Sequence, residues 1–207
     1  RKKNQDYANI SSIDDNTYLF TVADGHGSDG QKVSEFITNN FKSHLKSNMV
    51  SLNLSNTSNS TTNEYNLKDI IIHSNNQVCD QLQKCDFDTS HSGSTLVNVI
   101  LNSINNSLVC SWTGDSRAVI VSHNIDKQFH VKKLTNDHNP NDKKELKRVL
   151  KCGADVQKLK NSMGDECGPL RVFNKNAQYP GLAMTRSFGD TIGRESGIIH
   201  DSEMSDY

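Results

Sequence analysis

The segment NTYLFTVADGHGSDG (residues 16–30) decides the fold, because an alternating run ends there in a cluster of glycines and acidic residues. Residues 16–23 alternate and are rich in strand formers, which predicts a strand that ends at Asp24. A polar turn with a capping aspartate is one interpretation of the cluster. The other is that the strand end holds a carboxylate rigidly while Gly25 lets the backbone approach a ligand. Carboxylate and carbonyl oxygens suit Mg²⁺ or Mn²⁺.

Helical spacing follows directly after this segment. Apolar residues recur at helical positions over 30–48, and again after residue 66, so two amphipathic helices are predicted. The Asn- and Ser-rich stretch 51–63 between them cannot bury enough apolar area to offset its ordering entropy, and it predicts a surface loop. The apolar positions are Val33, Phe36, Ile37, Phe41 and Leu45 in the first helix, and Leu67, Ile71, Val78 and Leu82 in the second.

The middle of the chain has a different character. Short apolar or alternating runs separated by turn residues predict three or four antiparallel strands. These runs are 94–102, 107–114, 117–123 and 128–135. A short helix is expected from Asp142, because residues 142–153 have an acidic start, a basic end and a glycine stop. Strands and helices in this order predict an α+β fold with sheets covered by helices.

Composition limits the classes of function. The 207 residues carry a formal net charge of −1, so no global field favours nucleic acid or an anionic membrane. No apolar run is long enough to span a bilayer, and no hydrophobic signal segment opens the chain. The five cysteines form no CxxC pair, which predicts reduced thiols and an intracellular protein, cytoplasmic or nuclear. We expect a monomer.

Three further polar clusters have ordinary structural interpretations when each is taken singly. TGDSRAVIV (113–121) predicts a hairpin with Asp115 at its tip. LTNDHNP (134–140) fits the entry to a helix. GLAMTRSFGD (181–190) fits a partly buried structural arginine, and its terminal Asp190 is not assigned as a metal ligand.

The ordered set of motifs is far more specific than any one of them. NQD (4–6), ADGHG (23–27), SGSTL (92–96), GDSRAV (114–119), LTNDHNPND (134–142), GLAMTRSFGD (181–190) and GIIHDSEM (197–204) follow one another along the chain. This order resembles the metal-dependent protein phosphatases of type 2C, also called PPM-type, nearly from end to end. The resemblance implies a β-sandwich of two antiparallel sheets flanked by helices. It also implies hydrolysis of phosphoserine and phosphothreonine in protein substrates with Mn²⁺ or Mg²⁺.

The resemblance assigns roles to particular residues. Asp24 matches the aspartate that bridges two metal ions, and Gly25 matches the glycine whose carbonyl binds one of them. Asp6 matches the acidic residue that supports the metal waters, and Arg1 matches the phosphate-binding arginine. Two such ions activate a water, so no enzyme nucleophile is needed.

Two matched positions and one substitution complete this assignment. Asp115 matches the aspartate associated with a weaker third metal in some members. His26 belongs to the motif, and we expect it to orient other groups of the site. Gln5 stands where many members have glutamate, which removes one negative charge beside the metals.

The family also needs a later Asp-Gly and a later Asp-Asn, each supplying a metal carboxylate. Here Asp-Gly occurs only at 24–25 and 29–30, and Asp-Asn only at 15–16. We therefore expect residues 1–207 to be part of one phosphatase domain, with its last strands and those ligands missing. Without them, we expect this stretch alone to be inactive and poorly soluble. The alternative function is that of a catalytically inactive family member acting as a binding or regulatory module.

Overall fold

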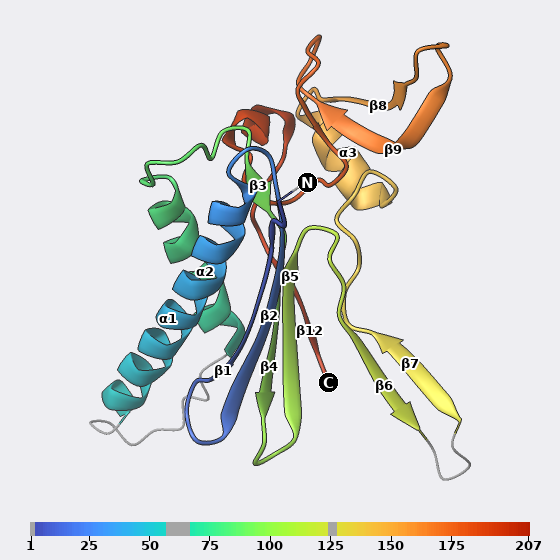
Figure 1. Cartoon of the computed structure of the whole chain (residues 1–207). Helices are drawn as coiled ribbons and strands as arrows, with labels where there is room; N and C mark the ends of the chain where they lie inside the picture. The colour runs from blue at the N-terminus through green and yellow to red at the C-terminus, as the bar shows by residue number, and fades with distance from the viewer. Residues whose placement is uncertain (1–2, 57–66, 124–127) are drawn as a thin grey trace.

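The computed structural model describes residues 3–56, 67–123 and 128–207, which build one large antiparallel sheet, two smaller sheets and their covering helices (Figure 1). The large sheet has seven strands in the order β11-β3-β2-β4-β5-β12, with β1 paired to β2 outside this path. Its strands are β1 (Asp6–Ser12), β2 (Thr17–His26), β3 (Gly93–Ser94), β4 (Leu96–Asn102), β5 (Ser107–Thr113), β11 (Phe188–Gly189) and β12 (Glu203–Asp206).

Strand β2 gives the sheet two different faces. Leu19 and Ala23 are buried on one face, whereas Phe20 and Val22 point to the other, as the alternation in the sequence predicts. The strand continues through Asp24 to His26, two residues beyond the predicted end. It continues because β3 pairs with Gly25 and His26 and so extends the ladder.

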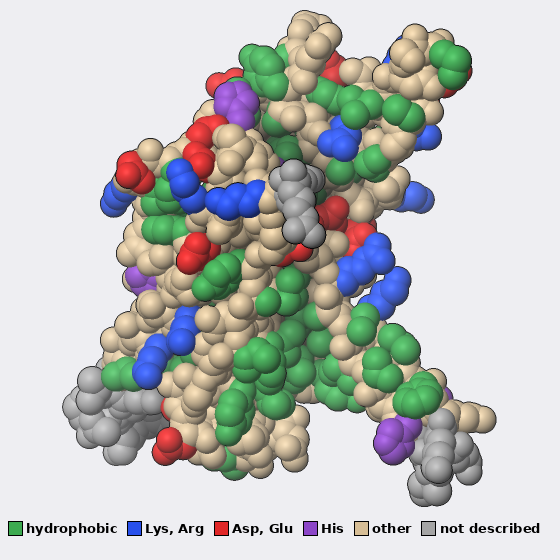
Figure 2. Space-filling model, in the orientation of Figure 1, with side chains coloured by type: hydrophobic (Ala, Val, Ile, Leu, Met, Phe, Trp, Pro, Cys, Tyr) green, Lys and Arg blue, Asp and Glu red, His purple; other side chains and the backbone are tan. Residues whose placement is uncertain are grey.

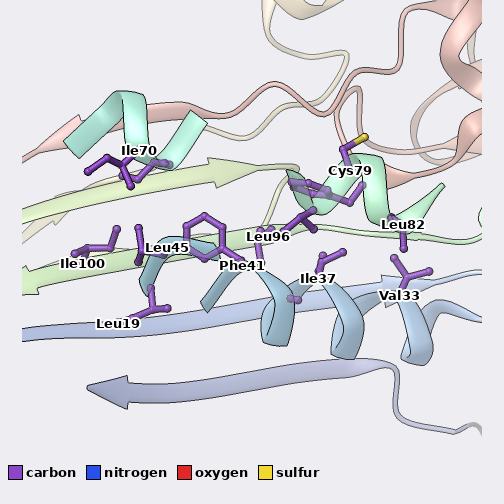
Figure 3. Packing of buried hydrophobic residues seen from close by; sticks show 14 of the residues in the cluster. Leu19, Val33, Ile37, Phe41, Leu45, Ile70, Cys79, Leu82, Leu96 and Ile100 are labelled. Carbon is purple, nitrogen blue, oxygen red and sulfur yellow. The ribbon is translucent and has the colours of Figure 1, made fainter. Parts of the chain in front are cut away.

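Helices α1 (Gly30–Asn56) and α2 (Leu67–Leu82) cover the first face (Figures 1 and 3). The predicted apolar stripe of α1 packs between the strands and α2, which confirms the helix and its buried side. The helix runs to Asn56, so residues 51–56 of the predicted loop are helical, and residues 57–63 lie outside the described part of the chain. The core between sheet and helices includes Leu19, Val33, Ile37, Phe41, Leu45, Ile71, Val78, Leu82, Leu96 and Ile100.

The second face of the sheet lacks such a cover along β1 and β2. Ile10, Phe20 and Val22 are exposed there, and Figure 2 shows hydrophobic side chains gathered on this face. Further along, the hairpin of β6 (Val119–His123) and β7 (Phe129–Lys133) begins at a smaller core, where Ala118 and Ile120 pack near Trp112. Antiparallel sheets with flanking helices confirm the α+β class.

A third unit lies at the end of the sheet where β2 ends (Figure 1). Helix α3 (Lys143–Lys151) follows its N-cap Asp142, the residue at which the sequence predicts the helix to start, and the Asp142 side chain accepts hydrogen bonds from the amides of Lys144 and Glu145. Beside it lies the small sheet of β8 (Asp155–Lys160), β9 (Glu166–Phe173) and β10 (Pro180–Leu182). The 3₁₀-helix η1 (Thr191–Ser196) follows β11. No helix in the described part of the chain is long and apolar enough to cross a membrane.

Candidate functional site

Two aspartates face each other at the end of the β1–β2 ladder. Asp6 pairs directly with Asp24, so both side chains lie on the face of the sheet that the helices leave uncovered. A hollow of about 400 Å³ opens beside them. It is lined by Lys3, Asn4, Gln5, Asp6, Asp24 and Gly25. The structure thus brings two of the candidate residues, Asp6 and Asp24, to one hollow together with Gly25 of β2.

Gly25 is required by the close approach of three backbone segments. A Cβ atom at this position would lie 2.2 Å from the carbonyl oxygen of Gly30 and 2.6 Å from that of Gln5. The amide of Gly25 donates to the same Gln5 carbonyl at 3.2 Å. The side chain of Gln5 donates to the carbonyl of Gly27 at 2.6 Å, so this residue serves the turn.

Thr95 fixes the backbone of Asp24. Its Oγ1 accepts a hydrogen bond from the Asp24 amide at 2.9 Å, and its own amide donates to the Asp24 carbonyl at 3.0 Å. The same hydroxyl lies 2.7 Å from Oγ of Ser116. Thr95 thus joins the end of β2 to the segment that carries Asp115. The sequence marked this residue only as part of the SGSTL motif.

Asp115 lies in a connection between two sheets, so the predicted hairpin is wrong. Strand β5 pairs with β4 and β12, whereas β6 pairs with β7. Gly114 takes a φ of +101°, and its carbonyl accepts from the amide of His138 at 3.0 Å, which turns the chain out of the large sheet. With both edges of β5 occupied, β6 cannot return along it.

The charges at this site repel one another. The pKa of Asp24 is raised by burial, by repulsion from Asp6, by a hydrogen bond with Asp6 that needs a proton, and by repulsion from Asp115. The pKa of Asp115 is raised by burial and by repulsion from Asp137, which outweigh the attraction of His26 and Arg117. Bringing these carboxylates together therefore costs folding free energy unless a cation joins them.

His26 completes the described part of the site. Its Nε2 lies 2.7 Å from Oδ2 of Asp190. Burial lowers the pKa of His26, but this hydrogen bond and the negative charges of Asp190, Asp24 and Asp115 outweigh burial and raise it. The sequence identified RSFGD as a motif without assigning Asp190 to the site. Arg1 lies outside the described residues, so its predicted contact with phosphate stays a prediction.

The donor atoms suit a hard divalent cation. Across residues 3–56, 67–123 and 128–207, no three side chains of His, Cys, Asp or Glu form a group that could hold a metal ion by themselves. Mg²⁺ commonly keeps several waters and binds through one or two carboxylates. Asp6, Asp24 and the carbonyl of Gly25 supply oxygens of this kind at a position where negative charge is in excess.

A second acidic group is buried in the part of the molecule that contains α3. Glu145 of α3 is 3% exposed and accepts hydrogen bonds from Arg148 at 2.6 and 2.7 Å and from Arg186 at 2.7 Å. Thr185 also donates to it. Although burial raises the pKa of Glu145, the hydrogen bonds and positive charges bring it well below its ordinary range. This carboxylate joins α3 to the segment before β11.

Comparison with known proteins places these features in a family. The family model described as protein phosphatase 2C matches residues 2–205. Probable protein phosphatase 2C 72 of Arabidopsis thaliana is 32% identical over 192 residues, which cover 92% of this chain and 56% of the relative. Probable protein phosphatase 2C 35 of the same plant is 28% identical, with 99% of this chain and 59% of the relative covered. The chain thus spans slightly more than half the length of these relatives.

The fold comparison agrees. The crystal structure of serine-threonine phosphatase 2C from Toxoplasma gondii matches with a TM-score of 0.73 at 19% identity, covering 100% of this chain and 70% of the other. A C. elegans sex determining protein matches with a TM-score of 0.71 at 23% identity, covering 100% and 45%. At these identities the structures support the fold alone. With a family model that covers nearly every residue, the chain belongs to the protein phosphatase 2C family.

Proposed function

We propose that the protein to which this chain belongs is a metal-dependent phosphatase that hydrolyses phosphoserine and phosphothreonine in protein substrates. One observation carries the proposal: Asp6 and Asp24 face each other, with Asp115 close enough to raise the pKa of Asp24. Such an excess of negative charge repels a phosphate dianion unless cations intervene. Family membership supports the phosphatase activity, and the carboxylates support its dependence on a metal ion.

We assign the metal-binding roles as follows. Asp24 and the carbonyl of Gly25 would hold Mn²⁺ or Mg²⁺ at a site for two ions, Asp6 would support the waters of these ions, and Asp115 would serve a weaker third ion. Bound there, the ions would polarise the phosphoryl group and activate water for its hydrolysis. Unaided hydrolysis of phosphate monoesters is among the slowest reactions known, so strong charge stabilisation is needed.

The chain's own groups would orient the substrate and keep the carboxylates in place. Arg1 would bind phosphate oxygens through its planar guanidinium group. Thr95 holds the backbone of Asp24 from both its hydroxyl and its amide. His26, beside Asp24 on β2, would orient groups at the reacting phosphate.

The proposal is tested by hydrolysis of a phosphothreonine peptide by the full-length protein. We expect turnover with Mn²⁺, none with excess EDTA, and recovery when Mn²⁺ is returned. Asp24→Ala should lower kcat/KM by about 10³-fold or more, which is about 4 kcal/mol of transition-state stabilisation. Asp15→Ala, at the far end of the β1–β2 hairpin, is the matched control and should leave turnover unchanged.

The inactive-module alternative makes a different prediction. A member without catalysis would show no Mn²⁺-dependent turnover and would still bind phosphopeptide or protein partners. Turnover by Asp24→Ala at the wild-type rate would also reject our assignment of the metal ligands. A location inside the cell is proposed as well, because all five cysteines are free. The monomeric state stays a prediction.

A further inference from the structure

Asp190 is a buried carboxylate that reaches the site from the other end of the chain. Its exposed fraction is 1%, and its Oδ2 lies 2.7 Å from Nε2 of His26, which precedes it by 164 residues. The contact is built on one row across the sheet, because His26 pairs with Gly93 and Gly93 pairs with Gly189. Asp190 follows this row directly. The side chain of His26 therefore meets Asp190 across strand β3.

Neighbouring residues hold Asp190 in the position from which it contacts His26. A Cβ atom on Gly93 would lie 2.1 Å from Oδ2 of Asp190, so a side chain there would displace the carboxylate. Asp190 itself takes a left-handed conformation, with φ 46° and ψ 42°, which residues other than glycine rarely adopt. Its amide donates to the carbonyl of Ser92 at 3.0 Å. A strained backbone held in this way is a common feature of functional sites.

The hydrogen bonds at Oδ2 determine which ring nitrogen of His26 carries a proton. Ser187 donates its hydroxyl to the same oxygen at 2.6 Å. An ionised carboxylate only accepts, so Nε2 of His26 must be the donor. The other ring nitrogen, Nδ1, is buried and has no hydrogen-bond partner among the described residues. Nδ1 is thus the ring atom left for a group that enters the site.

We propose that Asp190 is a positioning residue, which fixes the ring of His26 with a proton on Nε2 and leaves Nδ1 without a hydrogen-bond partner among the described residues. Such outer partners of functional histidines fix the orientation and the tautomer of the ring. Asp190 acts through His26 and touches neither metal nor substrate. The kinetic part of this inference rests on the proposed phosphatase activity, whereas the hydrogen bond itself does not.

The first test is spectroscopic and independent of activity. In the metal-free full-length protein at about pH 9, where histidines are neutral, the Nε2 proton of His26 should give a downfield NMR resonance protected from exchange. His26→Gln assigns it by removing it. Asp190→Gly should abolish the resonance while keeping the backbone conformation, because glycine adopts a positive φ freely. Ser187→Ala is the matched control, since it removes the other donor to Oδ2 and should retain the resonance.

The second test is a double-mutant cycle on phosphopeptide hydrolysis. Asp190→Gly should lower kcat by about 10- to 100-fold with KM changed by less than about twofold. In the His26→Gln background the same substitution should change kcat by less than about twofold, because its effect passes through the ring. Ser187→Ala should cost less than about threefold in kcat, since Asp190 still accepts from His26.

The outcomes separate this inference from the proposed function. If wild-type protein lacks the protected Nε2 proton, or Asp190→Gly retains it, the positioning role is wrong; the wild-type spectrum alone decides this if the variant does not fold. An equal loss of kcat in both backgrounds would make Asp190 a structural residue and overturn the proposal. If no variant or wild-type protein hydrolyses phosphopeptide, the proposed function fails, and the NMR result still decides whether Asp190 holds the ring.

Discussion

Two acidic groups in this chain are held in opposite ways. Glu145 is buried and accepts hydrogen bonds from two arginines and a threonine, which together bring its pKa well below the ordinary range. Asp24 lies opposite Asp6 and near Asp115, and burial and repulsion raise its pKa. The first carboxylate has its cations within the described fold, whereas the second is surrounded by more negative charge.

Glu145 thus stabilises the fold, whereas Asp24 is available to bind a cation. Removing the charge of Glu145 takes an ionic partner from the buried Arg186 and from the partly buried Arg148, which is costly. Removing the charge of Asp24 relieves repulsion in the metal-free protein. The same chemical change at the two positions should therefore shift stability in opposite directions, and ligand binding should respond only at the second.

The largest effect on stability is expected at the buried group. Glu145→Gln should lower the free energy of unfolding of the full-length protein by about 3 kcal/mol at pH 7, because Arg148 loses its ionic partner and Arg186 keeps only its pair with the more exposed Glu203. Urea unfolding monitored by circular dichroism measures this change. Glu35→Gln on the exposed side of α1 is the control and should stay within about 0.5 kcal/mol of wild type. If Glu145→Gln lowers the free energy of unfolding no more than the control does, Glu145 does not stabilise the fold through its ion pairs.

The stability lost in the Glu145→Gln variant should depend on pH. The pKa of Glu145 is lower in the folded protein than in the unfolded chain, where it has its ordinary value of 4.5. Unfolding therefore binds a proton as the pH falls below that value, and the stability contributed by Glu145 is lost. As the pH falls, the difference in free energy of unfolding between wild type and Glu145→Gln should decrease by at most about 1.4 kcal/mol per pH unit. Urea titrations at pH 7 and at about pH 4 measure this difference, and a difference that widens in acid would refute the assignment.

Asp24 should respond to metal where Glu145 does not. In EDTA at pH 7, Asp24→Asn should leave the free energy of unfolding unchanged or raise it by less than about 1 kcal/mol. Mn²⁺ at ten times its dissociation constant should stabilise the wild type by about 1.4 kcal/mol and Asp24→Asn by much less. Differential scanning calorimetry with and without Mn²⁺ compares the two. Equal stabilisation of both proteins would mean that Asp24 is not a ligand.

The smallest effect is expected at an exposed pair near the site. Arg117 donates to both carboxylate oxygens of Asp137, at 2.7 and 2.6 Å, and its side chain is 63% exposed. Arg117→Ala should leave the free energy of unfolding close to that of wild type, because solvent screens such pairs. The same urea series measures it. A loss near that of Glu145→Gln would show that burial is not what distinguishes the two ion pairs.

Much of the covered side of the molecule could be predicted from the sequence. The spacing of apolar residues along α1 and β2 reflects the burial of one side of each element in the same core. Val33, Ile37 and Phe41 of α1 are all fully buried there. The sequence of strand β1 shows no alternation of buried apolar and exposed polar residues. Its exposed side carries Asp6, Ala8 and Ile10, and its other side has no row of buried apolar residues. Its position follows from pairing with β2, which no local pattern reveals. The exposed strands β8 and β9 were missed for the same reason.

The candidate site divides in a similar way. Asp24, Gly25 and Asp115 stand in local motifs, so the sequence could identify them as candidates. Their environment depends on contacts between distant segments, such as Thr95 with the backbone of Asp24. The role of Asp190 required a contact across 164 residues. The hairpin predicted around Asp115 failed because β12, near the end of the chain, occupies the edge of β5.

The pairing of β1 with β2 makes the length of a distant turn important for the site. Seven residue pairs join these strands, from Asp6 with Asp24 to Ser12 with Tyr18, and the connection is closed by the Ile13 amide donating to the Thr17 carbonyl at 2.8 Å. Deleting or inserting one residue there would shift the ladder by one position and turn Asp6 to the other face. Natural variation in this hairpin should therefore favour substitutions and avoid single-residue insertions and deletions, although its tip lies at the opposite end of the strands from the aspartates.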